Sequence, residues 1–258
     1  MIVTITRHIS PRFNDCELTH LDRQPIDLEL ARVQHAQYEA ALRELGCHVI
    51  SLPAEADLPD SVFVEDVALV FDEAAIITRP GADSRKPETA SIARALSPYR
   101  TLHFIQAPGT LDGGDVLCVG RRVYVGLSSR SNSAVVEQLQ AYLAPYGYTV
   151  AGVQVTGCLH LKSAVTQVAA DTVLINRQWI DSRHFEGLKW IEVDNTEPQA
   201  ANALLIGATA IYPGSYPRTR QRLAEAGVCV KAVEVSEVIK AEGAVTCCSL
   251  VFSAFGSH

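Results

Sequence analysis

Short apolar runs alternate with turn-forming residues along most of this chain. The runs at 47–52 and 74–78 are apolar or alternate with polar residues over the length of one strand, which predicts β-strands. Longer segments between such runs place apolar residues three or four positions apart, the spacing of one helix face. The predicted helices are 27–45, 87–96, 131–143 and 218–226. The pattern therefore predicts an α/β protein in which helices separate small sheets.

A predicted strand pair recurs at five places, and polar residues interrupt its start at the same phase in four of them. The five segments are 60–78, 112–126, 158–176, 198–213 and 242–252, and they recur at spacings of roughly 40–60 residues. One such sheet is too small to bury a core by itself, so we interpret the pattern as radial repetition within a single domain, residues 1–258. The polar segments would then converge on one axis. The alternative is a mixed α/β sheet with unrelated hairpins.

The segment 111–115 reads Leu-Asp-Gly-Gly-Asp, although strands seldom contain Asp or Gly. Such a local exception predicts either a close backbone approach or a charge presented at that place. Asp112 and Asp115 are therefore candidate site residues, and the alternative is a polar turn with solvated acids. Residues 10–26 contain prolines and show no strand or helix period, so we expect a long loop, which is typical of lids and binding loops.

Composition and charge argue against several classes of function, among them nucleic-acid binding. The chain has 258 residues and a formal net charge of −7, and no basic stripe is present, which argues against nucleic-acid binding. We find neither a signal peptide nor an apolar run long enough to cross a bilayer. The seven cysteines are scattered without a Cys-x-x-Cys pair, which favours a reducing cytoplasm over a disulfide framework or a structural zinc site.

Two further positions carry candidate chemistry. His160 alternates with its leucine neighbours in a strand-like pattern, and Cys247 and Cys248 are adjacent in a predicted terminal strand, where one of them would face away from the other. A thiol becomes a nucleophile when a nearby positive charge lowers its pKa. The residues alone leave two interpretations open: a Cys–His site with acids from other segments, or ordinary strand residues.

Five segments together resemble one enzyme family. They are 60–66, 79–85, 111–115, 159–163 and 246–249. In this order, and over nearly the whole chain, they closely resemble the dimethylarginine dimethylaminohydrolases (dimethylargininases) of the guanidine-modifying superfamily. The resemblance implies an α/β fold that is a five-bladed ββαβ propeller with pseudo-fivefold symmetry and an active site on the central axis. The five repeated segments agree with that architecture.

The resemblance also implies roles for single residues at the reacting end of the substrate. Cys247 would be the nucleophile that attacks the guanidinium carbon. His160 would protonate the leaving amine and then activate water, while Asp112 would orient His160. Glu65 and Asp66 would bind the guanidinium, a planar cation that pairs well with carboxylates.

The remaining implied contacts hold the amino-acid end of the substrate. Asp60 would bind the α-amine, assisted by the backbone carbonyls of Leu18 and Ala241. Arg85 and Arg130 would bind the α-carboxylate. Together these charges match a zwitterionic amino acid with a cationic tail.

The implied activity is hydrolysis of Nω,Nω-dimethyl-L-arginine, and of Nω-monomethyl-L-arginine, to L-citrulline and dimethylamine or methylamine through a covalent cysteine thiouronium intermediate. No metal or organic cofactor is expected, although a thiolate beside a histidine could bind inhibitory zinc. The alternatives are an arginine deiminase or amidinotransferase of the same superfamily, or a non-catalytic guanidine-binding propeller. The expected partner is a small-molecule substrate in the cytoplasm, without nucleic acid or membrane, and a homodimer is left open.

Overall fold

The strands pair into small sheets of one repeated pattern. The computed structural model describes residues 1–254, and within this range the strands form five three-stranded sheets. In four of them, two consecutive strands form an antiparallel hairpin and a third strand then pairs in parallel with the second. These four sheets are β3 (Ala68–Val70), β4 (Ala74–Ile77) and β5 (Thr101–Phe104); β6 (Val116–Val119), β7 (Arg122–Leu127) and β8 (Thr149–Gln154); β9 (Val165–Ala169), β10 (Thr172–Ile175) and β11 (Lys189–Glu192); and β12 (Leu204–Ile206), β13 (Thr209–Pro213) and β14 (Cys229–Val233).

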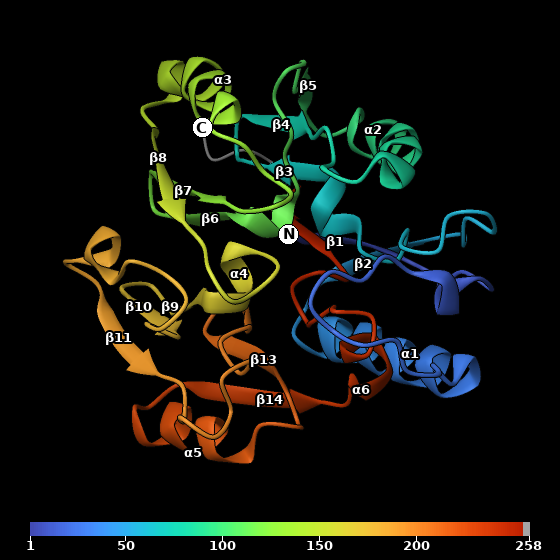
Figure 1. Cartoon of the computed structure of the whole chain (residues 1–258), viewed down its shortest axis with the longest axis vertical. Helices are drawn as coiled ribbons and strands as arrows, with labels where there is room; N and C mark the ends of the chain where they lie inside the picture. The colour runs from blue at the N-terminus through green and yellow to red at the C-terminus, as the bar shows by residue number, and fades with distance from the viewer. Residues whose placement is uncertain (255–258) are drawn as a thin grey trace.

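The fifth sheet joins segments from both ends of the described chain. Its central strand is β1 (Ile2–Arg7), which pairs antiparallel with β15 (Leu250–Ser253) and parallel with β2 (His48–Leu52). This is the same pattern as in the other four sheets, with the hairpin strands contributed by distant segments. Figure 1 shows the sheets following one another around the centre of the molecule.

Helices connect the strands within and between the sheets. They are α1 (Leu28–Glu44), α2 (Thr89–Leu96), α3 (Ala134–Leu143), α4 (Leu161–Ala164), α5 (Pro217–Glu225) and α6 (Ser236–Ile239). The longer helices α1, α2, α3 and α5 lie on the outside, whereas α4 lies near the centre (Figure 1). In the part of the chain that the structure describes, none of these helices has the length and apolar character needed to traverse a lipid bilayer.

In helix α1, local sequence determines where the helix begins, which face is buried and where it ends. Asp27 caps it, because its carboxylate accepts the backbone N–H groups of Glu29 and Leu30, both at 3.0 Å. Tyr38 and Leu42 are buried on its inner face, as the apolar spacing predicts. Gly46, with a φ of +86°, takes the left-handed conformation that ends the helix.

The polar segments lie just before the first strands rather than within them. Residues Val64–Val67 and Gly113–Asp115 form 3-10 turns, and residues 245–248 form a turn before β15. His160 is the residue preceding α4, so the prediction of strand structure at His160 and at the cysteine pair was wrong. Strand β11 was not predicted either. At each polar segment, hydrogen bonds to other segments replace strand pairing, and single-sequence strand propensity does not contain them.

Candidate active site

Gly113 and Gly114 allow their own segment to approach the segments of Asp66 and His160 at the centre of the molecule. A Cβ on Gly113 would lie 1.9 Å from the carbonyl oxygen of Glu65, and one on Gly114 would lie 2.6 Å from Nδ1 of His160. The N–H of Gly114 also donates to Oδ1 of Asp66 at 3.0 Å. The close backbone approach predicted from the Gly-Gly pair is therefore confirmed, and it brings Asp66 and His160 together.

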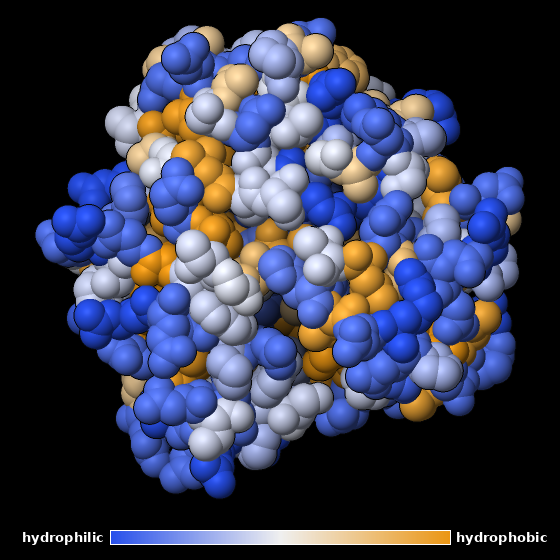
Figure 2. Space-filling model, viewed as in Figure 1, coloured by the Kyte–Doolittle hydropathy of each residue, from blue (hydrophilic) through white to orange (hydrophobic). Residues whose placement is uncertain are grey.

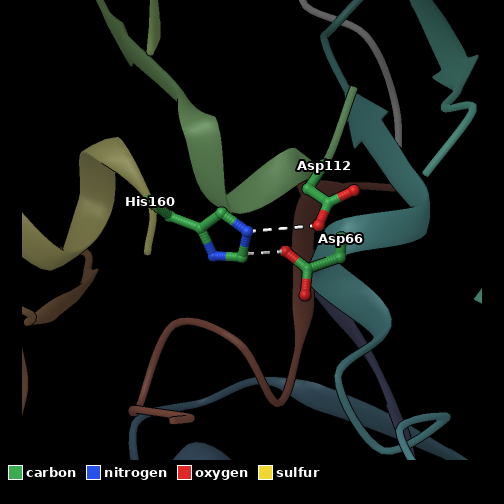
Figure 3. A group of neighbouring side chains, drawn as sticks. All are labelled: Asp66, Asp112 and His160. Carbon is green, nitrogen blue, oxygen red and sulfur yellow. Dashed lines mark hydrogen bonds and ion pairs between the residues drawn. The ribbon is translucent and has the colours of Figure 1, made fainter. Parts of the chain in front are cut away.

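The ring of His160 faces two neighbouring carboxylates, those of Asp112 and Asp66 (Figure 3). Its Nε2 is 3.2 Å from Oδ2 of Asp112, and its Nδ1 is 3.9 Å from Oδ1 of Asp66. The other oxygen of Asp112 accepts the N–H of Gly81 at 2.9 Å, which fixes that carboxylate. Burial alone would lower the pKa of His160, but the charge of Asp66 and the hydrogen bond to Asp112 raise it to about 9. The imidazole is therefore protonated at neutral pH and can act as a proton donor.

Asp115, the second acid of this segment, has a structural role. Its carboxylate accepts hydrogen bonds from the hydroxyls of Ser128 and Ser131 and from the N–H of Leu161. Both acids of the segment are fully buried, so the alternative of solvated acids in a polar turn was wrong. Burial raises the pKa of Asp115 to about 6. Because it holds Leu161, Asp115 fixes the start of α4, where His160 lies.

The adjacent cysteines have different surroundings. Cys247 lines the same cavity as His160. Cys248 is not among the described residues of that lining, and its thiol lies 3.7 Å from the carbonyl oxygen of Ala244. The expectation that one cysteine faces the site while its neighbour is buried elsewhere is therefore confirmed. The two cysteines lie in a turn, however, and not in a strand.

The thiol of Cys247 is protonated in the ligand-free protein. Burial, and then the charges of Glu65 and Asp66, raise its pKa well above the usual range. The carbonyl oxygen of Cys247 accepts the N–H of Glu65 at 3.2 Å, which ties the cysteine turn to the acidic segment. A cation placed against these carboxylates would oppose their effect and favour the thiolate.

Most of the predicted site residues line one small cavity, whose volume is about 20 Å³. The predicted residues that line it are Asp60, Asp66, Arg85, Arg130, His160, Ala241 and Cys247. Among the described residues, Leu18, Glu65 and Asp112 are not part of the lining. The sequence analysis did not identify Glu17, Phe63, Leu159, Glu242 and Gly243, which also line it. Each lies beside or within a predicted segment, so the segments were identifiable from the sequence but these single positions were not.

Arg85 is held by several protein groups at once. It donates to Oδ2 of Asp66 at 2.6 Å, to the carboxylate of Glu88, and to the carbonyl oxygens of Asp60 and Phe63. Burial raises the pKa of Asp66, but His160 and Arg85 outweigh this and keep it below its ordinary value. Arg85 therefore keeps Asp66 ionised beside the cavity.

Asp60 and Arg130 are a carboxylate and a cation that also line the cavity. The carboxylate of Asp60 accepts the N–H of Glu17, with 3.1 Å to the nearer oxygen. Burial raises the pKa of Asp60. Arg130 donates to the hydroxyl of Thr19 at 3.1 Å and lies 3.7 Å from Asp112. Both residues thus contact the loop that contains Leu18.

Glu65 lies behind the cavity lining. Its carboxylate accepts Nζ of Lys162 at 2.6 Å and the hydroxyl of Thr246 at 2.8 Å. Burial raises the pKa of Glu65, and the charge of Lys162 opposes that rise. In this ligand-free arrangement the carboxylate is occupied by protein partners, and its predicted contact with a guanidinium stays a prediction.

The carboxylate of Glu242 holds a further part of the loop over the cavity. Glu242 accepts the backbone N–H groups of Thr19 at 3.0 Å, of Leu21 at 2.5 Å and of the intervening His20. Glu242 itself has a φ of +58°, a left-handed conformation that is unusual for a residue with a side chain. The loop predicted to be a lid is therefore fastened to the segment that follows Ala241.

Three of the site groups have a spacing that could suit a metal ion. Donor atoms of Asp66, Asp112 and His160 lie within 4.8 Å of one another. These atoms already have partners, and a histidine with a pKa of about 9 must lose its proton before it can bind a metal. The group is better suited to a buried ion pair, and the absence of a metal requirement stays a prediction.

A second, larger cavity adjoins the first. It has a volume of about 310 Å³ and shares Leu159, Glu242 and Gly243 with the small cavity. Trp179 and Tyr216 lie on its other walls. Figure 2 shows that this face of the molecule is hollowed near its centre, among both hydrophobic and hydrophilic residues.

Comparisons with known proteins agree with this geometry. Residues 18–197 match the family model described as N,N dimethylarginine dimethylhydrolase, eukaryotic. The chain is 39% identical to the N(G),N(G)-dimethylarginine dimethylaminohydrolase of Streptomyces coelicolor over 95% of both chains. It is 36% identical to the enzyme of that name from Pseudomonas aeruginosa over 88% of this chain and 90% of the relative.

A solved structure gives the same result in three dimensions. It is the dimethylarginine dimethylaminohydrolase of Pseudomonas aeruginosa, as a cysteine-to-serine mutant in complex with citrulline. The two structures superpose with a TM-score of 0.93 at 34% sequence identity, over 97% of this chain and 98% of the other. From its fold, its site and these relatives, the chain belongs to the dimethylarginine dimethylaminohydrolase family.

Proposed function

We propose that the protein hydrolyses Nω,Nω-dimethyl-L-arginine, and Nω-monomethyl-L-arginine, to L-citrulline and dimethylamine or methylamine. The observation that carries this proposal is the lining of the small cavity, where a thiol, a protonated imidazole and carboxylates lie together. The citrulline bound in the Pseudomonas aeruginosa relative is the product that this reaction would give. Family membership supports the same chemistry.

We further propose that residues 1–258 form a single domain, a five-bladed ββαβ propeller with pseudo-fivefold symmetry. The five sheets of identical connectivity support this, as does their arrangement around the centre in Figure 1. The axis of such a propeller would pass through the site, because the polar segments of different sheets meet there.

Substrate binding would use the charges at the two ends of the cavity. The guanidinium would lie against Asp66, with Glu65 reachable behind it, while Asp60 and the carbonyls of Leu18 and Ala241 would bind the α-amine. The small cavity has room for about one water molecule. An arginine-sized substrate therefore requires the loop over the cavity to move before it binds.

The two arginines contribute differently to this arrangement. Arg85 already donates to two carboxylates and two backbone carbonyls. Arg130, in contrast, donates to the hydroxyl of Thr19, which belongs to the movable loop. The α-carboxylate would therefore pair mainly with Arg130, whereas Arg85 would position Asp66 and support the electrostatic field of the site.

The first half of the reaction would form the covalent intermediate. The guanidinium charge would offset the carboxylates around Cys247 and favour loss of the thiol proton to solvent, which leaves the thiolate. The thiolate sulfur would bond to the guanidinium carbon, and the bond from that carbon to the dimethylamine nitrogen would break as His160 gives its proton to the departing nitrogen. Asp112 would hold the ring of His160 in place during this transfer.

The second half would release citrulline. Neutral His160 would take a proton from water, whose oxygen then bonds to the same carbon. The carbon–sulfur bond would break with its electron pair returning to Cys247, and the proton of the added hydroxyl would pass to that sulfur, which restores the thiol and leaves the ureido group of citrulline. Each step uses protein groups and water, so no cofactor is required.

The proposal is tested by measuring citrulline release from dimethylarginine, monomethylarginine and arginine, with and without a chelator. We expect turnover of the methylated substrates that Cys247→Ser abolishes. Strong preference for arginine would favour an arginine deiminase, and amidino transfer to an added amine would favour an amidinotransferase. Tight binding without any product would favour a guanidine-binding protein.

We also propose a small-molecule substrate as the main partner and a cytoplasmic location. The seven cysteines support the location, because all lie in the described residues and none forms a disulfide. The net charge of −7 supports the absence of a nucleic-acid partner. Sedimentation velocity would decide whether two copies form a homodimer.

A further inference from the structure

Asn202 lies between the two segments that contain the proposed nucleophile and proton donor. Its Oδ1 accepts the backbone N–H of Thr246 at 3.1 Å, and its Nδ2 donates to the hydroxyl oxygen of the same threonine at 3.0 Å. Nδ2 also donates to the carbonyl oxygen of Lys162 at 3.1 Å. Thr246 directly precedes Cys247, and Lys162 follows His160 by two positions.

The partners fix the orientation of this amide. A backbone N–H requires an acceptor, and a backbone carbonyl requires a donor, so Oδ1 must face Thr246 and Nδ2 must face Lys162. The hydroxyl of Thr246 gives its single proton to Glu65 and can therefore only accept from Asn202. Asn202 is 4% exposed and lines the larger cavity, and both polar atoms of its amide have protein partners.

The contacts continue around the acidic segment. Glu65 joins Thr246 through the hydroxyl, joins Lys162 through Nζ, and donates its own N–H to the carbonyl oxygen of Cys247. Asn202 and Glu65 thus link the same two segments from two sides. Asn202 bonds to backbone atoms of both Thr246 and Lys162, whereas Glu65 bonds to the side chains of these two residues.

We propose that Asn202 is a positioning residue that sets the place of Cys247 relative to His160. This inference rests on the proposed function, for which it supplies a further segment of the site, contributed by the loop before β12. Asn202 belongs to the segment 198–213, which was expected to converge on the axis but in which the sequence identified no single candidate site residue. It does not line the small cavity, and it acts through the backbone of Thr246 and Lys162.

The substitution Asn202→Asp tests this role with little change in shape. An oxygen replaces Nδ2 and would face the carbonyl of Lys162 and the hydroxyl oxygen of Thr246, two groups that cannot donate to it. We expect the cysteine turn to shift and kcat to fall about 10- to 100-fold, since small displacements of reacting groups have effects of this size. KM should change much less, because no substrate contact is removed.

Asn176→Asp is the matched control. Asn176 is also 4% exposed, donates through Nδ2 to the carbonyl of Pro198 and accepts the N–H of Gln178. Asn176→Asp thus makes the same chemical change, an amide to a carboxylate, at a residue that is equally buried but lies away from Cys247 and His160. We expect a comparable fall in Tm with kcat close to that of the unsubstituted protein.

A second measurement needs no substrate. The rate at which iodoacetamide alkylates Cys247, located by mass spectrometry, is followed against pH for both variants. Asn202→Asp should move this profile to higher pH, because a carboxylate is added near the thiol, whereas Asn176→Asp should leave it unchanged. If the unsubstituted protein lacks hydrolase activity, the proposed function fails while this profile still tests the positioning role.

Equal kcat and equal alkylation profiles for the two variants would overturn the proposal. Should Asn202→Asp fail to fold, the same assays are applied to Thr246→Ser and Thr246→Val. The serine retains the hydroxyl and should retain activity, and the valine should reproduce the loss in kcat. Equal activity of these two would also overturn the proposal.

Discussion

Single backbone positions decide whether the charged groups of the site can meet. Gly114 has His160 on one side and donates its N–H to Asp66 on the other. Because Gly is unfavourable in strands, the sequence predicted that the glycine pair allows a close backbone approach. It did not reveal which groups approach, since the partners come from segments 48 and 46 positions away. Those partners followed only from the family resemblance.

Replacing Gly114 by alanine should impair catalysis more than stability. The added Cβ would lie 2.6 Å from Nδ1 of His160 and 2.9 Å from Oδ1 of Asp66, so the ring and this carboxylate must shift relative to each other. We expect kcat to fall by at least about tenfold, in line with the cost of misplacing a reacting group. Steady-state kinetics beside a thermal unfolding scan would check this. Unchanged kcat would mean that His160 tolerates displacement.

His160 should titrate well above an ordinary histidine. We expect NMR of the imidazole to give a midpoint near pH 9 in the ligand-free protein, since Asp66 and Asp112 favour the charged form. In Asp112→Asn the midpoint should move to lower pH, because the hydrogen bond to a charged acceptor is lost. A midpoint at or below the ordinary value of 6.5 would contradict the assignment of His160 as proton donor.

The same shift has a consequence for stability. The pKa of His160 is higher in the folded protein than in the unfolded chain, so its protonation stabilises the fold fully below about pH 6.5. That contribution is lost as the pH rises towards about 9. The free energy of unfolding should therefore fall more steeply over this window in the unsubstituted protein than in His160→Gln. Urea denaturation at several pH values would measure the difference.

At the scale of elements, local periodicity predicted the four longer helices and the hairpins, but not the short helices α4 and α6 or the turns that carry the chemistry. Helix α1 and its cap were predictable because their determinants are neighbours in sequence. The turn that contains Cys247 depends on Glu65 and Asn202, and the start of α4 depends on Asp115. Such contacts between distant segments override strand propensity and are not visible in a single sequence.

The loop over the cavity should open when Glu242 is replaced. Glu242→Gly removes the carboxylate that accepts three backbone N–H groups, while glycine suits the φ of +58°. We expect tryptic cleavage after Arg23 to accelerate by at least about tenfold, since hydrogen bonds to a charged group are each worth about 1.5–3 kcal/mol. Cleavage at the unsubstituted rate would mean that other contacts hold the loop.

At the scale of the whole molecule, one sheet holds the two ends of the described chain together. Ile5 in β1 pairs with Leu250 in β15 and with Ile50 in β2. The repeated strand pairs predicted the hairpins of the other sheets, because each hairpin lies within one stretch of sequence. They did not predict that β15 takes β1 as its partner, since no local pattern links segments so far apart.

Shortening the core side chain of this sheet should destabilise the protein strongly. Ile5 is fully buried, so Ile5→Ala should lower the free energy of unfolding by about 2–5 kcal/mol. Val33→Ala, at a position that is 53% exposed on α1, should change it by less than about 0.5 kcal/mol. Urea denaturation of both variants would measure this, and equal losses would contradict the importance of the sheet.

The pairing of Thr4 with Val251 also has a kinetic consequence. Its sequence separation spans nearly the whole described chain, and contacts of such high contact order form slowly because loop-closure entropy opposes them. The turn with Cys247 leads directly into this strand. During refolding from denaturant, circular dichroism should therefore recover before catalytic turnover, and the delay would measure the rate of the last strand pairing.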